Sequence, residues 1–214
     1  IKEAASWFLD GVFLNYNSSY LERMLEQLLD EAESPEVTRF LRAVDVRIDG
    51  FRVEKAPEWR GQRVFVRHEV DGKGYELRLS EESAGTQKLM GLAAYLMTAL
   101  ERGATVVVDE LDAKLHPKLL RYVILLFKNP EVNKSGAQLI FSSQDVSTMR
   151  NDVFRRDEIW FAARGEGEAS QLWSLADIHE ANSNLVSRNA AFDKQYLSGR
   201  YGADPYITRI EEWV

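Results

Sequence analysis

The stretch that decides the fold runs from Ser83 to Asp112 and reads S-A-G-T-Q-K-L-M-G-L-A-A-Y-L-M-T-A-L-E-R-G-A-T-V-V-V-D-E-L-D. Its first half predicts a helix over Gln87–Arg102, because apolar residues recur there every three or four positions. Gly103 ends that helix. The short apolar run Thr105–Val108 follows, and it is typical of a strand buried on both faces of a parallel sheet.

Downstream of this stretch, helix and strand patterns continue to alternate. Pro117 predicts the start of a second helix, which ends near Asn129-Pro130. Gln138–Phe141 predicts another buried strand, followed by Ser142-Ser143-Gln144-Asp145. The alternation indicates βαβ units, so we expect an α/β fold with a parallel sheet and flanking helices.

Upstream, the pattern changes twice. We expect residues 1–44 to be helical, with Val12 and Phe13 on one apolar face and a short helix from Pro35. From residue 44 to 80 apolar and polar residues alternate, and Asp71-Gly72-Lys73-Gly74 is a strong hairpin turn. This part predicts a small antiparallel sheet that leads directly into Ser83.

The C-terminal part predicts two strands, 158–163 and 171–175, around a glycine-bearing turn. The polar tail from residue 178 contains one expected helix, near residues 188–197. We therefore expect a helical segment at 1–43, a core lobe at 44–175, and a tail at 176–214 that is a possible partner-binding region.

The composition is that of an ordinary globular protein of 214 residues. A net charge of -7 argues against a generally basic nucleic-acid surface, although a local patch stays open. No apolar run approaches the roughly 18 residues of a membrane span, and cysteine is absent, so we expect a cytoplasmic protein. Because the chain begins without Met and inside an expected helix, we expect it to be part of a longer protein.

The adjacent carboxylates Asp109 and Glu110 are the strongest chemical feature. At the end of a strand, one carboxylate can hold Mg²⁺ through water while its neighbour orients or deprotonates an attacking water. Adjacent acids also occur by chance as solvated turn residues. The pair alone leaves both interpretations open.

A second feature lies one helix upstream. Ser83-Ala84-Gly85-Thr86 is placed at a helix N-terminus, where free backbone N–H groups and the helix dipole favour an anion. The alternative is an ordinary N-cap, with Ser83 capping and the glycine easing the turn. Its place before a strand that ends in two carboxylates favours the anion site.

The order of these motifs resembles the C-terminal lobe of ATP-binding-cassette (ABC-type) ATPases. The resemblance rests on S-x-G, a helix, V-V-V-D-E-L-D-A-x-L-H-P, a second helix and Q-L-I-F-S-S-Q-D, and it covers residues 75–162. Within that family the chain is most similar to the SMC/RecF/OLD-like branch. This branch includes AAA-annotated ATP-binding proteins of bacterial phage-defence systems.

The resemblance implies a role for each matching residue. Asp109 would assist Mg²⁺ binding and Glu110 would be the catalytic base. Asp112 would lie in the D-loop, which meets its counterpart across a dimer. The signature loop, which contacts the γ-phosphate of ATP bound to the opposite subunit, would consist of Ser83, Ala84, Gly85 and Thr86. ATP and Mg²⁺ are thus the implied cofactors.

Two departures from the family pattern bear on activity. Gln144 occupies the position of the switch histidine, and a glutamine can donate a hydrogen bond to a phosphate but cannot carry a proton's charge. This puts the rate of hydrolysis in doubt. The sequence also contains no G-x-x-x-x-G-K-[ST], so we expect the phosphate-binding P-loop lobe outside these residues.

The leading hypothesis is an ATPase lobe that forms a homodimer or higher oligomer around ATP and so switches a protein effector, a nuclease or toxin, in anti-phage defence. An alternative is a non-hydrolysing scaffold that holds or inhibits a toxin or nuclease and uses nucleotide as a clamp. A third is a DNA-repair ATPase, for which a coiled coil or basic surface would be expected and neither is evident.

Other candidates have ordinary explanations. We expect His68 to be solvated and His116 to be structural at a helix start. His179 with Asp177 and Glu180 lacks a further ligand for a metal site. The basic residues Arg150, Arg155 and Arg156 are best explained as a solvated face. The aromatic residues Trp160, Phe161 and Trp173 are expected in the core.

Overall fold

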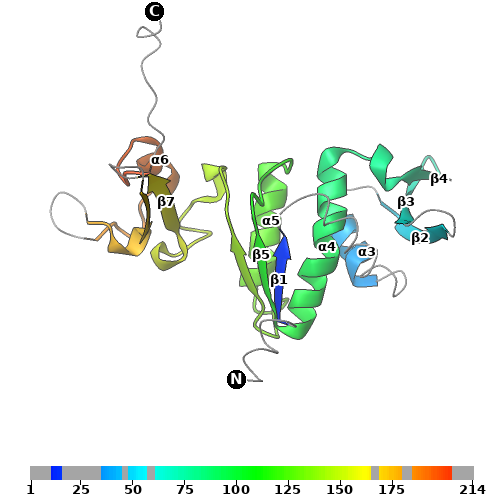
Figure 1. Ribbon diagram of the computed structural model, residues 1–214, viewed down its shortest axis with the longest axis horizontal. Coiled ribbons are helices and arrows are strands. Elements are labelled where there is room, and N and C mark those ends of the chain that lie inside the picture. The colour runs from blue at the N-terminus through cyan, green and yellow to red at the C-terminus, as the bar shows by residue number, and fades with distance from the viewer. Residues whose placement is uncertain are drawn as a thin grey trace, which may run out of the picture. The chain divides into compact units, whose positions relative to one another are not determined.

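The computed structural model in Figure 1 describes residues 11–15, 35–44, 48–56, 61–164, 169–179 and 185–203. The chain divides into two units, 1–144 and 145–214, each of which is described by itself. The boundaries expected at 43/44 and 175/176 stay predictions.

The first unit contains a parallel sheet whose strands are β1 (Val12–Asn15), β5 (Thr105–Val108) and β6 (Gln138–Phe141). Their order is β1-β5-β6, and both pairings are parallel. β5 is therefore the central strand, and its Val106 and Val108 are buried. The predicted α/β fold with a parallel sheet is confirmed.

Strand β1 corrects the expectation that residues 1–44 are helical. Val12–Asn15 pairs with β5 from Val12 beside Thr105 to Asn15 beside Val108. A short apolar run has no helical or strand period of its own, and here pairing with a sheet edge outweighs helix formation. The expected helix around residues 20–29 lies outside the described residues.

Strand β6 forms where predicted, but the expectation that it is buried is wrong for the described chain. Its side chains are exposed or half-buried, and Ile140 is 56% exposed. The reason is position, because β6 lies at an edge of the described sheet and β5 lies at its centre.

The structure contains the three expected helices α3 (Pro35–Ala43), α4 (Ala84–Arg102) and α5 (Pro117–Lys128). Ser83 caps α4, which begins a few residues before the expected start. Gly103 ends α4 in a left-handed conformation, φ 72°, where glycine bears no Cβ penalty. Pro117 occupies the first turn of α5.

The three helices pack against one another and on the sheet (Figure 1). α3 contacts α4, α4 contacts β5, and α5 contacts β6. Phe40 of α3 also lies against Tyr122 of α5, with ring centroids 6.3 Å apart. Full burial of one large apolar side chain in this core contributes about 1.5–3 kcal/mol to stability. The fully buried side chains of this core include Leu41, Leu89, Met90, Leu92, Leu96, Val106, Leu111 and Leu120.

The predicted antiparallel sheet is also present, with strands β2 (Gly50–Ala56), β3 (Gly61–Val70) and β4 (Lys73–Arg78) in that order. Asp71 and Gly72, both with positive φ, form the two-residue turn between β3 and β4. The short helix η1 (Leu79–Glu81) then leads to Ser83.

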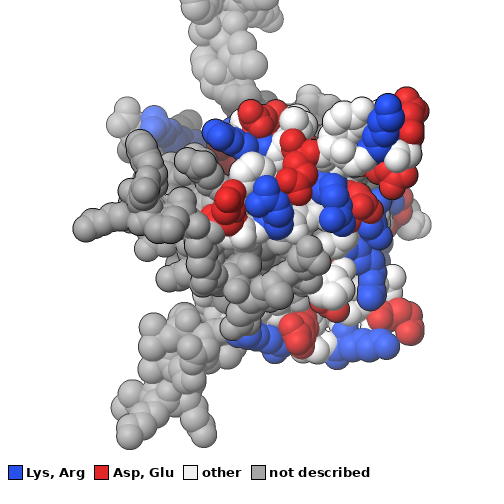
Figure 2. All heavy atoms as spheres, turned by 90° about the vertical axis from the view of Figure 1, so that its right-hand side faces the viewer, with Lys and Arg blue, Asp and Glu red and all other residues white. Residues whose placement is uncertain are grey.

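The side of this unit that carries the antiparallel sheet bears charges of both signs. Figure 2 shows positive and negative side chains interspersed over that side. Arg52 pairs with Glu76 at 2.9 Å, and Arg67 pairs with Asp49 at 3.0 Å. Because neighbouring acids neutralise these arginines, the described residues on this side do not form a basic surface for nucleic acid.

The second unit has its own apolar core. Strands β7 (Trp160–Arg164) and β8 (Ser170–Ser174) pair antiparallel, and helix α6 (Phe192–Leu197) covers part of the core. Phe161 is at its centre, stacked on Tyr196 with centroids 5.7 Å apart. Trp160, expected in the core, is 58% exposed. The short helices η2 (Val146–Thr148), η3 (Arg156–Glu158) and η4 (Leu175–Asp177) complete the unit.

None of the helices in the described ranges combines the length and apolar character of a membrane span.

Candidate functional site

The candidate site is built from the carboxyl ends of two adjacent strands. Asp109 and Glu110 follow β5, Ser142 follows β6, and parallel pairing places these positions side by side. The Ser142 hydroxyl donates to Asp109 Oδ1 at 2.5 Å and accepts from the Glu110 backbone N–H at 2.8 Å. One hydroxyl therefore orders both carboxylate residues, whose side chains remain exposed.

Residues 109–115, called the carboxylate turn below, have an unusual backbone. Glu110 has φ 49° and Lys114 has φ 64°, both in the left-handed region that non-glycine residues rarely adopt. The Leu111 N–H donates to the Ser142 carbonyl, and the Ala113 N–H donates to the Glu110 carbonyl. Such a conformation costs on the order of 1–3 kcal/mol and persists only where its surroundings hold it.

The N-terminus of α4 lies in the same unit. The Ser83 hydroxyl accepts from the Thr86 N–H at 3.1 Å and lies 2.9 Å from the Thr86 hydroxyl. The first backbone hydrogen bond within the helix runs from Gln87 to Ser83, so the amides of Ala84 and Gly85 precede it. These amides at a positive helix end suit an anion. Ser83 is thus an N-cap, and that role is compatible with the anion site.

Gly85 lies against the carboxylate turn. A Cβ atom at this position would lie 2.9 Å from the backbone carbonyl oxygen of Lys114. The absence of a side chain therefore permits the close approach of α4 to the turn.

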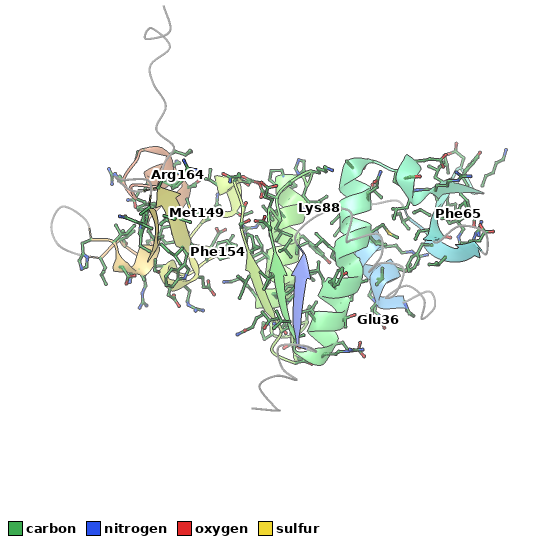
Figure 3. All side chains as sticks on the ribbon, viewed as in Figure 1. Glu36, Phe65, Lys88, Met149, Phe154 and Arg164 are labelled. Atoms are coloured by element: carbon green, nitrogen blue, oxygen red, sulfur yellow. The ribbon has the colours of Figure 1, made fainter. Side chains whose placement is uncertain are left out.

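Lys88 provides a second contact between α4 and the turn. Its Nζ donates to the backbone carbonyl of Glu110 at 2.5 Å, and Figure 3 labels this lysine on the flank of α4. Burial lowers the pKa of Lys88, while the carboxylates of Asp112, Glu110 and Asp109 oppose that shift. Lys88 is therefore a half-buried cation beside three acids.

Asp112 and Gln144 meet at the same strand ends. The Gln144 backbone N–H donates to Asp112 Oδ2 at 3.2 Å. The other carboxylate oxygen, Asp112 Oδ1, is buried and has no hydrogen-bond partner among the described residues. An unpaired buried carboxylate oxygen is costly. The positive charge of Lys88 attracts the Asp112 carboxylate and so offsets part of this cost. The Gln144 side chain is exposed.

The structure thus places all the predicted site residues in one unit: Asp109, Glu110, Asp112, Gln144, and Ser83 to Thr86. Three contributing residues were missed. Ser142 follows a predicted strand, and a hydroxyl beside the end of the neighbouring strand was a usable signal. Lys88 and Lys114 carried no signal, since a lysine in a helix or turn is most often solvated.

The residues present fit a magnesium nucleotide. Mg²⁺ is held in nucleotide sites through one or two carboxylates together with phosphate oxygens and water. Asp109 offers an exposed carboxylate, of which only Oδ1 is engaged by Ser142. The described residues contain no group of three or more acids and histidines that would hold a metal ion by themselves. An exposed single carboxylate of this kind suits a metal whose remaining ligands are phosphate oxygens and water.

Two histidines, His68 and His116, have structural roles. His68, expected to be solvated, is half-buried and lies 2.6 Å from the Glu82 carboxylate, immediately before Ser83. That expectation is wrong, because the hairpin places His68 next to Glu82, which directly precedes the N-cap of α4. His116 is structural, as predicted: its Nδ1 accepts from the Lys118 N–H at the start of α5.

The arginine cluster of the second unit is paired with acids or backbone. Arg150 bonds to Asp152, Arg155 bonds to Asp157, and Arg156 donates to a backbone carbonyl. These pairings favour the solvated-face interpretation over a nucleic-acid patch.

Comparison with known proteins places the chain among ATPase-like domains. The matching family model is described as "AAA domain, putative AbiEii toxin, Type IV TA system" and covers residues 3–150. No curated protein matches the chain. Solved structures also match the chain, among them two that are each 17% identical to it.

One comes from a structural study of ATP-driven dimerisation and DNA-stimulated activation of SMC ATPases. Its TM-score is 0.48, and the match covers 73% of this chain and 88% of that chain. The other is an Smc head bound to the C-winged helix domain of ScpA, with a TM-score of 0.41 and coverage of 65% and 42%. Both similarities are remote. The family model, in contrast, spans more than half of the sequence, so the chain belongs to the AAA-domain family that it describes.

Proposed function

We propose that this chain is an ABC-type ATPase lobe that binds ATP and Mg²⁺ and hydrolyses ATP when a P-loop from outside these 214 residues completes the site. The observation that carries the proposal is the pair Asp109 and Glu110, exposed at the end of β5 and ordered by the Ser142 hydroxyl.

Each residue then has a chemical role. Asp109 holds the metal through its carboxylate, and the bound metal neutralises phosphate charge. Glu110 orients the attacking water and accepts its proton. Gln144, at the end of the next strand, donates a hydrogen bond to phosphate without contributing charge.

We propose that residues 83–86 serve a second nucleotide, bound by another copy of the chain. The amides at the start of α4 are oriented for an anion, and the Ser83 and Thr86 hydroxyls lie beside them. Two copies would then enclose ATP as a homodimer or within a higher oligomer, and nucleotide binding would supply association energy.

ATP turnover by the full-length protein tests the catalytic role. Glu110→Gln keeps the size and hydrogen bonding of the side chain but removes the base. We expect kcat to fall by about 10²-fold or more, with little change in KM. Glu131→Gln, at an exposed glutamate after α5, is the matched control and should be neutral. Equal turnover by wild type and Glu110→Gln would exclude Glu110 as the base.

Association tests the second role. In the Glu110→Gln background, ATP should trap the dimer, which light scattering after size exclusion detects. Adding Ser83→Arg should abolish this dimer, because the larger side chain fills the anion position. Adding Ser80→Arg, at an exposed serine nearby, is the control. Unchanged ATP-dependent association of the Ser83→Arg protein would refute the placement of the second nucleotide.

We further propose that the ATP-driven change switches a protein effector, a nuclease or toxin, in cytoplasmic anti-phage defence. The support is the toxin and toxin–antitoxin wording of the family description. Phage plating on cells that carry the native locus tests it: Glu110→Gln should change protection, and Glu131→Gln should not.

A non-hydrolysing scaffold is the second candidate, and Gln144 favours it because the switch position has no titratable group. In that case ATP would trap the dimer in wild type as strongly as in Glu110→Gln, and no phosphate would be released.

A further inference from the structure

Two contacts join α4 to the carboxylate turn. At the first turn of the helix, Gly85 lies so close to the Lys114 carbonyl that a Cβ would be 2.9 Å from it. One turn later, Lys88 Nζ donates to the Glu110 carbonyl. The contacts engage opposite ends of the turn, and each engaged residue, Glu110 and Lys114, has a left-handed backbone.

The Glu110 peptide groups are held from both sides. The N–H is bound by the Ser142 hydroxyl, and the carbonyl accepts from both Lys88 and the Ala113 N–H. A charged donor makes the Lys88 hydrogen bond stronger than a neutral one. A glutamate with a left-handed backbone conformation persists only where its surroundings hold it. These three partners therefore fix the backbone of Glu110, and with it the position from which the side chain extends.

Electrostatic attraction to nearby carboxylates also stabilises Lys88 at this position. Of the three carboxylates that attract it, Asp112 has the largest effect on its charged form. Asp112 is also the residue whose Oδ1 is buried without a hydrogen-bond partner in the described part of the chain. The ammonium thus offsets the charge of a cluster that would otherwise repel itself.

We propose that Lys88 is a positioning residue that fixes the Glu110 backbone to α4, so that the catalytic carboxylate and the α4 N-terminus move together. The inference rests on the proposed function. Since residues 83–86 serve the partner's nucleotide and Glu110 serves this chain's own, the Lys88 contact is then a physical link between two ATP sites of the dimer.

The test uses Lys88→Met in the full-length protein, because methionine keeps most of the apolar stem and removes the donor and the charge. Lys88→Arg keeps both. Lys118→Met, at an exposed lysine of α5, is the matched control. Two measurements are made on each protein: amide hydrogen exchange in the carboxylate turn, and ATP turnover with kcat and KM separated.

For Lys88→Met we expect faster exchange in the carboxylate turn, above all at the Ala113 amide, which shares the Glu110 carbonyl with Lys88. Exchange within α5 should stay unchanged. We expect kcat to fall about 10- to 100-fold with KM nearly constant, since a displacement of about 1 Å at a catalytic group has effects of this size. Lys88→Arg should restore most of both, and Lys118→Met should match wild type.

The outcomes separate this inference from the proposed function. Wild-type exchange in the Lys88→Met turn would show that the contact does not hold the turn and would overturn the inference. Faster exchange with unchanged kcat would overturn the positioning role while the proposed function stands. If wild type and Glu110→Gln turn over equally, the proposed function falls and the positioning role falls with it.

Discussion

Alanine at position 85 probes how tightly α4 is packed on the carboxylate turn. Its Cβ would lie 2.9 Å from the Lys114 carbonyl oxygen, closer than real Cβ contacts. The obstacle is backbone, and Lys114 already has a left-handed φ of 64°. The turn therefore has little freedom to move aside, and the helix start has to shift instead.

Two opposing effects set the size of the result. Inserting a methyl group into a closely packed site costs about 1–3 kcal/mol. Alanine gains up to about 1 kcal/mol over glycine inside a helix, and part of this gain applies in the first turn. We expect Gly85→Ala to lower the free energy of unfolding by about 1–2 kcal/mol.

Denaturant unfolding of the full-length protein, followed by circular dichroism, measures that free energy. Gly74→Ala is the control, because nothing lies within 4 Å of a Cβ at that position. The control should be neutral or slightly stabilising. If Gly85→Ala proves as stable as wild type, the close packing of α4 on the turn is refuted.

Three further predictions concern single groups. Ser142→Ala removes the hydrogen bonds to Asp109 and Glu110 and should cost about 1–2 kcal/mol in denaturant unfolding; no loss would show that the hydroxyl does not order the turn. Gly103→Ala combines a positive φ with a Cβ 2.3 Å from the Ser135 carbonyl oxygen, so we expect about 2–4 kcal/mol of destabilisation, seen as a lower Tm. Burial raises the pKa of Tyr95 to about 12 from 10.0. The folded protein then keeps a proton that the unfolded chain releases, so stability falls as pH rises from about 10 to about 12. Tyr95→Phe should reduce that loss in unfolding midpoints measured across this range.

Much of the fold was predictable because its signals are local. Ser83 and Gly103 bound α4, Pro117 begins α5, and Asp71-Gly72 makes the hairpin turn. Each depends on the backbone preference of a few adjacent residues. The apolar run of β5 also indicated a buried strand that ends in the two carboxylates.

The missed features depend on residues distant in sequence. Val12–Asn15 becomes a strand because β5 offers an edge, which no four-residue pattern reveals. Ser142 joins the site through strand pairing across 32 positions, and Lys88 through a contact across 22. Trp160 was expected in a core, but its side of β7 is exposed. Tertiary placement decided these cases.

The edge position of β6 has a practical consequence for anyone who produces this protein. β6 is the last strand of the sheet among the described residues, and Ile140 adds an exposed apolar side chain there, through which two copies of the chain can associate. In the described chain β6 carries no charged residue of its own to discourage such pairing. Expression of these 214 residues alone should therefore yield aggregates that grow with concentration, and Ile140→Lys should keep the protein monodisperse.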